Sequence, residues 1–334
     1  MFNAPSRVRA MLRALSPRRP LTRAPLTRAQ AIVVALAACS PILAVAAQAF
    51  AQTPTAAAST PAPTFASDRL SVVVTGSGPD VILIPGFASS RDVWQATADR
   101  LSATHRVHQV QLAGFAGEPW THGDGPFVQP VIDALAAYVQ QAGLDHPAII
   151  GHSMGGLSAI MLAQQHPDRV GRVMSVDSLP FYSALFGPQV TVEMARPFAA
   201  RAAASILTAA GPEFRASQTA TAVGMARDPA TRTAMVDWSM ASDRRAMAAA
   251  IRDVMLTDIR PGLATMTVPV WAPYAADADG GAPAAMADAL WAREYAALPG
   301  VRLVRVDGSR HFIMADQPER FADIVDDFLR QAGF

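Results

Sequence analysis

The amino-acid sequence predicts an α/β fold, in which a mostly parallel β-sheet carries helices on both faces. Short apolar runs typical of buried strands alternate with stretches of helical apolar spacing over residues 68–178 and again over 267–334. Between these parts, residues 179–266 contain no strand-like run and have only helical spacing. We therefore expect one α/β core, encoded in two parts, with an inserted helical region.

The strand-like runs are short and rich in Val, Ile and Leu, as expected for strands that are buried on both faces. Helical spacing follows most of them, with polar or Gly-containing turns between. Parallel strands need such crossover helices, which favours a parallel sheet. The expected strands are 70–74, 81–84, 107–112, 148–150, 173–176, 268–271 and 301–306, and the expected core helices include 92–101, 128–142 and 156–165.

The stretch Gly151-His-Ser-Met-Gly155 lies between an expected strand and an expected helix, and it fits the pattern G-x-S-x-G. A sharp strand-to-helix turn strains the residue at the bend, and glycines beside it avoid collisions with the neighbouring elements. Ser153 would then present its hydroxyl at the carboxyl edge of the sheet and at a helix N-terminus. We interpret Ser153 as a nucleophile, and the alternative is a structural turn with a buried serine.

Upstream, the expected strand 81–84 runs into Pro85-Gly-Phe-Ala88, and together with the Ser153 motif this arrangement resembles the α/β-hydrolase fold family. The resemblance implies an oxyanion hole formed by the backbone N–H groups of Phe87 and Met154. Relatives commonly have His-Gly where this chain has Pro85-Gly86. That difference leaves the backbone donor in place but removes a side chain that often organises the loop.

A serine hydroxyl needs a base to accept its proton. Among the seven histidines, His311 lies in Gly308-Ser-Arg-His-Phe312 after the last expected strand, and Pro318-Glu319 opens the C-terminal helix. This context resembles the position of the catalytic histidine in the family, so we expect His311 to be the general base. His152 lies inside the serine motif, where its side chain is expected to point away into the packing.

The acid that would orient His311 is left open between three aspartates. Asp277 and Asp279 follow the expected strand 268–271, which is the usual position in the family, although the usual His-Gly before the acid is missing. Asp177 follows the strand after the nucleophile helix, a less common position, and it also suits a turn. The sequence favours Asp277 slightly over Asp177, with Asp279 third.

The inserted region resembles the helical cap that many relatives carry over the carboxyl edge of the sheet. It is rich in Met, Phe and Trp side chains, most of which would form its own core while a few line a substrate pocket. Such a cap could open and close over the substrate. The expected cap helices span 192–209, 213–226, 229–241 and 244–257, with breaks at Gly211-Pro212 and Asp228-Pro229.

The N-terminus has the features of a secretory signal peptide. Seven arginines precede the apolar run 31–38, and Ala49-Phe-Ala51 has the small-x-small pattern of a cleavage site. We expect export to the periplasm or the medium, with a lipoprotein made through Cys39 or a retained anchor as alternatives. The expected organisation is a signal peptide at 1–51, a disordered linker at 52–67, the two core parts at 68–178 and 267–334, and the cap at 179–266.

Composition excludes several classes of function. The formal net charge is +1, which implies no nucleic-acid partner, and the single cysteine rules out a disulfide framework or a Cys-ligated zinc site. No apolar run after residue 51 is long enough to span a bilayer. We expect no cofactor and no metal.

From these residues we expect an exported serine hydrolase that cleaves carboxylic esters with a small or medium apolar acyl group. The same triad also serves amidases, lactonases, C–C bond hydrolases and cofactor-free haloperoxidases. A non-catalytic binding module on the same fold is the alternative from another class. Enzymes of the family that open epoxides or cleave carbon–halogen bonds have Asp at the nucleophile position, so Ser153 argues against those reactions.

Overall fold

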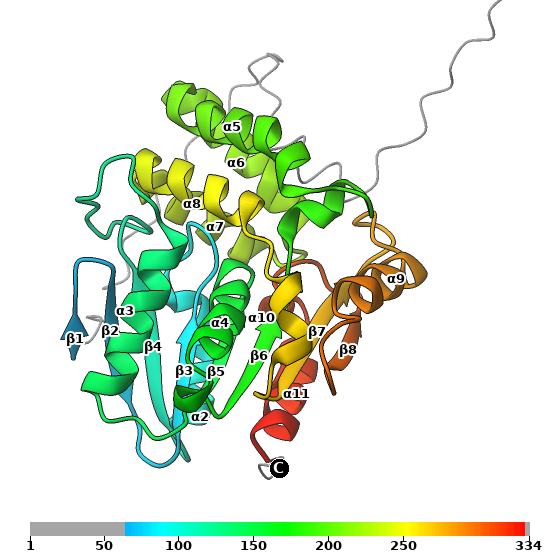
Figure 1. Ribbon diagram of the computed structural model, residues 1–334. Helices are drawn as coiled ribbons and strands as arrows, with labels where there is room; N and C mark the ends of the chain where they lie inside the picture. Colours follow the sequence, from blue (N-terminus) through cyan, green and yellow to red (C-terminus); the bar gives the residue numbers. More distant parts are fainter. Residues whose placement is uncertain (1–63, 331–334) are drawn as a thin grey trace, which may run out of the picture.

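The computed structural model describes residues 64–330 and contains one eight-stranded sheet (Figure 1). The strand order is β1-β2-β4-β3-β5-β6-β7-β8. β1 and β2 pair antiparallel with their neighbours, and all pairs from β4 to β8 are parallel. The strands are β1 (Phe65–Ala66), β2 (Leu70–Thr75), β3 (Asp80–Ile84), β4 (Arg106–Leu112), β5 (Ala148–His152), β6 (Arg172–Val176), β7 (Val270–Ala276) and β8 (Arg302–Asp307).

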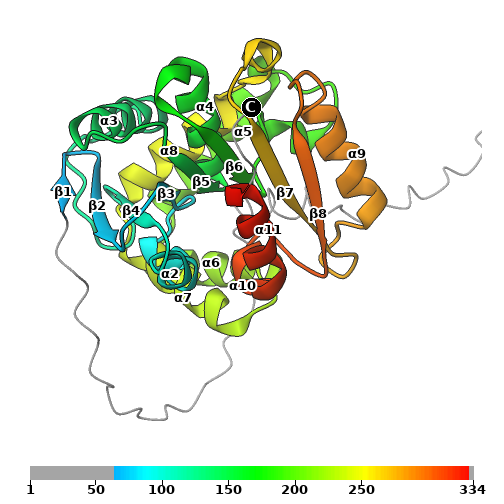
Figure 2. The ribbon, with the colours of Figure 1, turned by 90° about the horizontal axis from the view of Figure 1, so that it is seen from below.

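Helices cover both faces of the sheet, as predicted. Successive strand residues point to opposite faces, so Ile149 joins the core beneath α3, α4 and α9, whereas Ile150 joins the core beneath α2 and α11. Figure 2 shows these two layers of helices on either side of the strands. The helices of the core are α2 (Gln95–Leu101), α3 (Val128–Gln141), α4 (Met154–Gln165), α9 (Ala284–Glu294), α10 (Ile313–Asp316) and α11 (Pro318–Arg330), with short 3₁₀ turns η1 (Arg91–Trp94) and η2 (Pro167–Arg169).

Four helices lie above the carboxyl ends of the parallel strands (Figure 1). Each begins and ends within about two residues of the bounds predicted for the cap helices. Side chains at their N-caps fix where three of them begin, because Thr191, Asp228 and Asp243 accept hydrogen bonds from free N–H groups of the first turns. The helices are α5 (Val192–Thr208), α6 (Gly211–Met225), α7 (Pro229–Ala241) and α8 (Arg244–Leu256), and η3 (Tyr182–Phe186) and η4 (Arg260–Thr265) join them to the core.

Two predicted boundaries are wrong. β7 continues to Ala276, whereas the expected strand ended at Trp271 with a loop from Ala272 onward, and residues 272–276 instead pair with β8. At the end of the predicted linker, Phe65–Ala66 pairs with β2 as a short strand. The predicted signal peptide and the rest of the linker lie outside the described residues. None of the helices in residues 64–330 combines the length and the hydropathy that a membrane span requires.

Candidate active site

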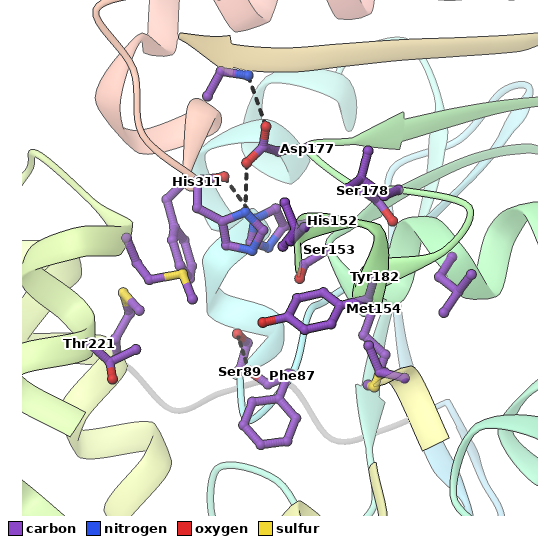
Figure 3. Close-up of a pocket in the computed structure, with 18 of the residues that line it drawn as sticks. Phe87, Ser89, His152, Ser153, Met154, Asp177, Ser178, Tyr182, Thr221 and His311 are labelled. Atoms are coloured by element: carbon purple, nitrogen blue, oxygen red, sulfur yellow. Dashed lines mark hydrogen bonds and ion pairs between the residues drawn. The ribbon is translucent and has the colours of Figure 1, made fainter. Parts of the chain in front are cut away.

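Ser153 occupies the sharp turn between β5 and α4. Its φ of +55° and ψ of −121° lie in a region that non-glycine residues rarely adopt. The turn is held because the Ser153 N–H donates to Val176 O on β6 at 2.9 Å, and the Ser153 carbonyl accepts from the N–H groups of Gly156 and Leu157. Strain of this kind persists only where the surroundings enforce it, and here it presents the serine side chain to the cavity above the sheet (Figure 3).

Both glycines of the motif are sterically required. A Cβ on Gly151 would lie 2.1 Å from the carbonyl oxygen of Gly155, and a Cβ on Gly155 would lie 2.4 Å from Ile84 O on β3. Real Cβ atoms do not approach backbone oxygens so closely, so any side chain would push the turn away from the sheet. The sequence-based explanation of the G-x-S-x-G pattern therefore holds at both positions.

His311 follows β8 and contacts Asp177, which follows β6. The His311 Nδ1 lies 2.7 Å from Asp177 Oδ2, and the second carboxylate oxygen accepts a hydrogen bond from the Ala275 N–H at 2.9 Å. Both side chains are mostly buried. Because Asp177 engages Nδ1, the Nε2 atom of His311 is the one left for a substrate or for Ser153, and Figure 3 shows His311 and Ser153 on the wall of one cavity.

Asp277 does not contact His311, so the favoured sequence-based choice of acid is wrong. Its Oδ1 accepts from Arg227 at 2.9 Å and its Oδ2 accepts from the Arg310 Nε at 2.9 Å. The third candidate for the acid, Asp279, is wrong too. Its carboxylate is exposed and lies 3.7 Å from Arg227, not beside His311. The physical reason is that β7 is longer than predicted, so Asp277 lies beside two guanidinium groups and not beside His311.

The charges around Asp277 keep it ionised. Burial raises the pKa of this carboxyl, but the hydrogen bond from Arg310 and the charges of Arg227 and Arg310 outweigh burial, so its pKa lies below the usual value. The carboxylate thus joins Arg310, the residue immediately before His311, to Arg227 in the cap. Its position indicates a structural ion-pair centre.

The loop that carries His311 is also bonded directly to the cap. The Phe312 N–H donates to Met225 O at the end of α6, at 3.2 Å. Asp316 accepts from the Arg310 N–H through Oδ2 at 2.7 Å and from the Arg227 N–H through Oδ1 at 2.7 Å. The residues on both sides of His311 are therefore fixed to the segment between α6 and α7. Sequence analysis missed this arrangement, since nothing in the local pattern pairs Arg227 with Arg310.

His152 is buried beneath the site, as predicted, and it also holds the His311 backbone. Its Nε2 lies 3.0 Å from the carbonyl oxygen of His311, so this nitrogen carries the proton and donates it. Burial, with a smaller contribution from the nearby His311, keeps the pKa of His152 well below its usual value. A neutral His152 with its proton on Nε2 is therefore the form that supports the His311 loop.

The two expected oxyanion donors lie next to Ser153. Met154 is the first residue of α4, so its N–H has no acceptor inside the helix. Phe87 follows Gly86, whose backbone is so close that a Cβ there would lie 3.1 Å from the Ser153 Cβ. No acceptor in residues 64–330 takes a hydrogen bond from either N–H group. Both donors are thus free to bind an oxygen atom at Ser153, with Pro85 in place of the usual histidine.

The cavity over Ser153 is lined mainly by apolar side chains from the core, η3, the cap and α9 (Figure 3). Its only ionisable side chains apart from Tyr182 are Asp177, His152 and His311, and no Arg or Lys lines it. Over the described part of the chain, no group of three His, Cys, Asp or Glu side chains is placed to hold a metal ion. The cavity therefore suits an uncharged, largely apolar ligand. The apolar lining includes Phe87, Leu157, Leu179, Leu185, Met225, Met235, Trp238, Ile251, Val254, Met286, Leu290 and Trp291.

Comparisons with known proteins agree with this geometry. The family model described as "Alpha/beta hydrolase family" matches residues 81–324. Among solved structures, an esterase from Thermogutta terrifontis superposes with a TM-score of 0.65 at 21% identity, covering 78% of this chain and 93% of that one. The enol-lactonase from Burkholderia xenovorans gives a TM-score of 0.64 at 20% identity, covering 78% and 96%. At identities this low, the two superpositions support the fold alone.

Curated relatives include proteins named pimeloyl-[acyl-carrier protein] methyl ester esterase. The protein from Vibrio atlanticus is 34% identical over 122 residues, covering 36% of this chain and 45% of the relative, so this match spans less than half of the relative's length. The protein from Aromatoleum aromaticum is 29% identical over 264 residues, covering 75% and 98%. With the family model matching most of the chain, this protein belongs to the alpha/beta hydrolase family.

Proposed function

We propose that this protein hydrolyses carboxylic esters through an acyl-enzyme on Ser153, with His311 as the base and Asp177 as the acid that orients it. The observation that carries the proposal is the 2.7 Å contact between Asp177 and His311, beside a strained serine in an apolar cavity. The proposed reaction is the one expected from the sequence, but the acid of the triad is Asp177 and not Asp277.

In the first half of the reaction, the Ser153 Oγ attacks the ester carbonyl carbon while its proton passes to His311 Nε2. Asp177 holds the imidazole in the required tautomer and stabilises the cation that forms. The N–H groups of Phe87 and Met154 bind the oxyanion of the tetrahedral intermediate. The intermediate then collapses, the alcohol leaves with the proton from His311, and the acyl group remains on Ser153.

In the second half, His311 takes a proton from a water molecule, and the resulting hydroxide attacks the acyl carbonyl. The carboxylic acid leaves and His311 returns the proton to the Ser153 oxygen. Besides the ester, these steps use one water molecule, the three side chains and the two backbone N–H groups.

Small or medium apolar acyl groups are the proposed substrates. The apolar lining of the cavity and the lack of Arg or Lys in it support this class. The names of the curated relatives support a carboxylic ester, since those proteins are methyl ester esterases.

Turnover of p-nitrophenyl esters from acetate to octanoate by the full-length chain tests this function. We expect hydrolysis that is lost in Ser153→Ala, because the nucleophile is then absent. Ser178→Ala is the matched control, since Ser178 lines the same cavity and has no role in the steps above. Covalent labelling by a fluorophosphonate without turnover of any ester would redirect the search to amides, lactones and C–C bonds. No labelling would favour the binding module.

We also propose export, which rests on the basic segment, the apolar run and the Ala49-Phe-Ala51 site of the N-terminus. N-terminal sequencing of the protein recovered from a bacterial periplasm tests it, and we expect a start at Gln52. A lipidated Cys39 at the N-terminus would establish the lipoprotein alternative, and an uncleaved chain would contradict processing.

A further inference from the structure

Tyr182, Gln218 and Thr221 are polar side chains of the cavity that have no role in the proposed mechanism. Tyr182 lies in η3, which follows β6, and Gln218 and Thr221 lie one turn apart on α6 of the cap. All three line the same cavity as Ser153, in a wall that is otherwise mostly apolar. Polar groups placed in an apolar pocket commonly set the orientation and specificity of the ligand.

The Tyr182 hydroxyl points into the cavity. In Figure 3 its ring lies beside Ser153, and its oxygen points toward the side of the cavity on which Thr221 lies. Within residues 64–330 no group forms a hydrogen bond with this hydroxyl, and burial alone raises the pKa of Tyr182 to about 12. The phenol therefore stays protonated and has a hydrogen bond to donate.

The Thr221 hydroxyl lacks the hydrogen bond that Thr219 forms on the same helix. A helical threonine can satisfy its hydroxyl on the carbonyl four residues earlier, as Thr219 does on Arg215 O at 2.9 Å. The Thr221 hydroxyl is buried and has no partner among the described residues. Such an unpaired buried hydroxyl destabilises the protein, and a hydrogen bond to a ligand oxygen would remove that cost.

Gln218 extends this polar surface of α6. Its residue is 7% exposed and lines the cavity, and its amide forms no hydrogen bond within the described part of the chain. An amide both donates and accepts, and so do the hydroxyls of Tyr182 and Thr221. With no Arg or Lys in the lining, these groups match a neutral ligand group and leave a carboxylate without a counter-charge.

We propose that Tyr182, Gln218 and Thr221 form a hydrogen-bonding subsite for a neutral carbonyl, hydroxyl or amide group on the non-reacting part of the substrate. The preferred esters would then carry a second uncharged oxygen in addition to the scissile group. This inference rests on the proposed ester hydrolysis and names the substrate class within it.

Matched esters test the subsite in the full-length enzyme. On the acyl side, kcat/KM is measured for p-nitrophenyl hexanoate and its 4-oxo and 5-oxo derivatives, and on the alcohol side for butyl and 3-oxobutyl acetate. We expect the best oxo-to-alkyl ratio of the wild type to be roughly 3- to 10-fold, the size of one neutral hydrogen bond. The p-nitrophenyl monoester of hexanedioic acid, which carries a carboxylate, should be cleaved more slowly than the hexanoate.

Isosteric variants assign the effect to the three side chains. Tyr182→Phe and Thr221→Val each lower the ratio toward 1, and Gln218→Leu does so as well. Thr219→Val makes the same chemical change on the exposed face of α6 and leaves the ratio unchanged. Because the readout is a ratio between two substrates, a general loss of folded enzyme cancels. A wild-type ratio near 1 in both series, or a ratio unchanged by all three variants, overturns the subsite.

A binding measurement separates this inference from the proposed function. Calorimetry on Ser153→Ala compares methyl 5-oxohexanoate with methyl hexanoate, and we expect roughly 3- to 10-fold tighter binding of the oxo ester, lost on adding Tyr182→Phe. If the wild type hydrolyses no ester but this preference is present, the proposed function fails and the subsite stands. Equal binding of the two esters counts against the subsite whatever the enzyme hydrolyses.

Discussion

Asp177 and Asp277 follow neighbouring parallel strands, β6 and β7, and both carboxylates are almost fully buried. Asp177 faces the imidazole of His311 and the N–H of Ala275, whereas Asp277 faces the guanidinium groups of Arg227 and Arg310. The two residues thus share a type, a place in the fold and a degree of burial. Only the groups opposite them differ.

The difference shows that a position at the end of a strand brings a carboxylate to this edge of the sheet but does not determine its role. A carboxylate that faces an imidazole can stabilise the cation formed during proton transfer. One that faces two guanidinium groups is already neutralised, and it contributes to the fold by joining the cap to the loop of His311.

Asp177→Asn should reduce kcat for a p-nitrophenyl ester by about 10⁴-fold, because an amide cannot stabilise the imidazolium and favours the wrong tautomer. Steady-state kinetics on purified folded protein measure this effect. The matched variant Asp277→Asn should keep kcat within about tenfold of the wild type. Equal losses of kcat in the two variants would contradict the different roles proposed for Asp177 and Asp277.

Asp277→Asn should instead lower the free energy of unfolding by about 2 kcal/mol, since it removes the shared partner of a mostly buried and a half-exposed guanidinium group. Urea unfolding followed by fluorescence measures the change. Asp279→Asn is the control, because this exposed carboxylate lies 3.7 Å from Arg227 and should alter stability by less than about 0.5 kcal/mol. A wild-type stability in Asp277→Asn would show that the ion pairs do not support the fold.

His152→Phe should lower kcat by roughly fivefold to tenfold and change KM less, because the His311 carbonyl loses its hydrogen-bond donor. His152→Gln can place an N–H near the same position and should recover part of the rate. Identical kinetics in both variants would mean that packing, and not the hydrogen bond, is the contribution of His152.

The pH dependence of stability should also distinguish Asp277. Its pKa is lower in the folded protein than in the unfolded chain, so its stabilising contribution is complete above the unfolded pKa of about 3.9 and is lost as the pH falls through the folded pKa. The stability difference between wild type and Asp277→Asn should therefore shrink when the pH falls from 6 toward 3. Urea unfolding at several pH values measures it, and a constant or growing difference would contradict the lowered pKa.

Sequence patterns predicted most of the fold because they report local requirements. The glycines beside Ser153, the apolar strands and the helix breaks of the cap each have a physical cause within a few residues, and the structure has the same elements. The end of β7 was missed because residues 272–276 contain no Val, Ile or Leu, and their place in the sheet comes from pairing with β8, which no local pattern reports.

The site was harder to predict than the fold. Ser153 and His311 lie in stretches whose neighbours have a recognisable pattern, and the structure brings both side chains to one cavity. The choice between Asp177 and Asp277 depends on Arg227 and Arg310, which are far apart along the chain and meet only in the folded protein. The subsite residues Tyr182 and Thr221 carry no local signal either, because an unpaired hydroxyl is a property of the packed structure.

The most direct test of the account is the rate at which a fluorophosphonate labels the full-length chain, with the modified peptide identified by mass spectrometry. The wild type and Asp277→Asn should be labelled on Ser153 at similar rates, and Asp177→Asn should be labelled at least about a thousandfold more slowly, because His311 no longer activates the serine. Labelling on another residue, or slow labelling in Asp277→Asn with a normal rate in Asp177→Asn, would contradict the assignment of Ser153, His311 and Asp177 as the catalytic triad.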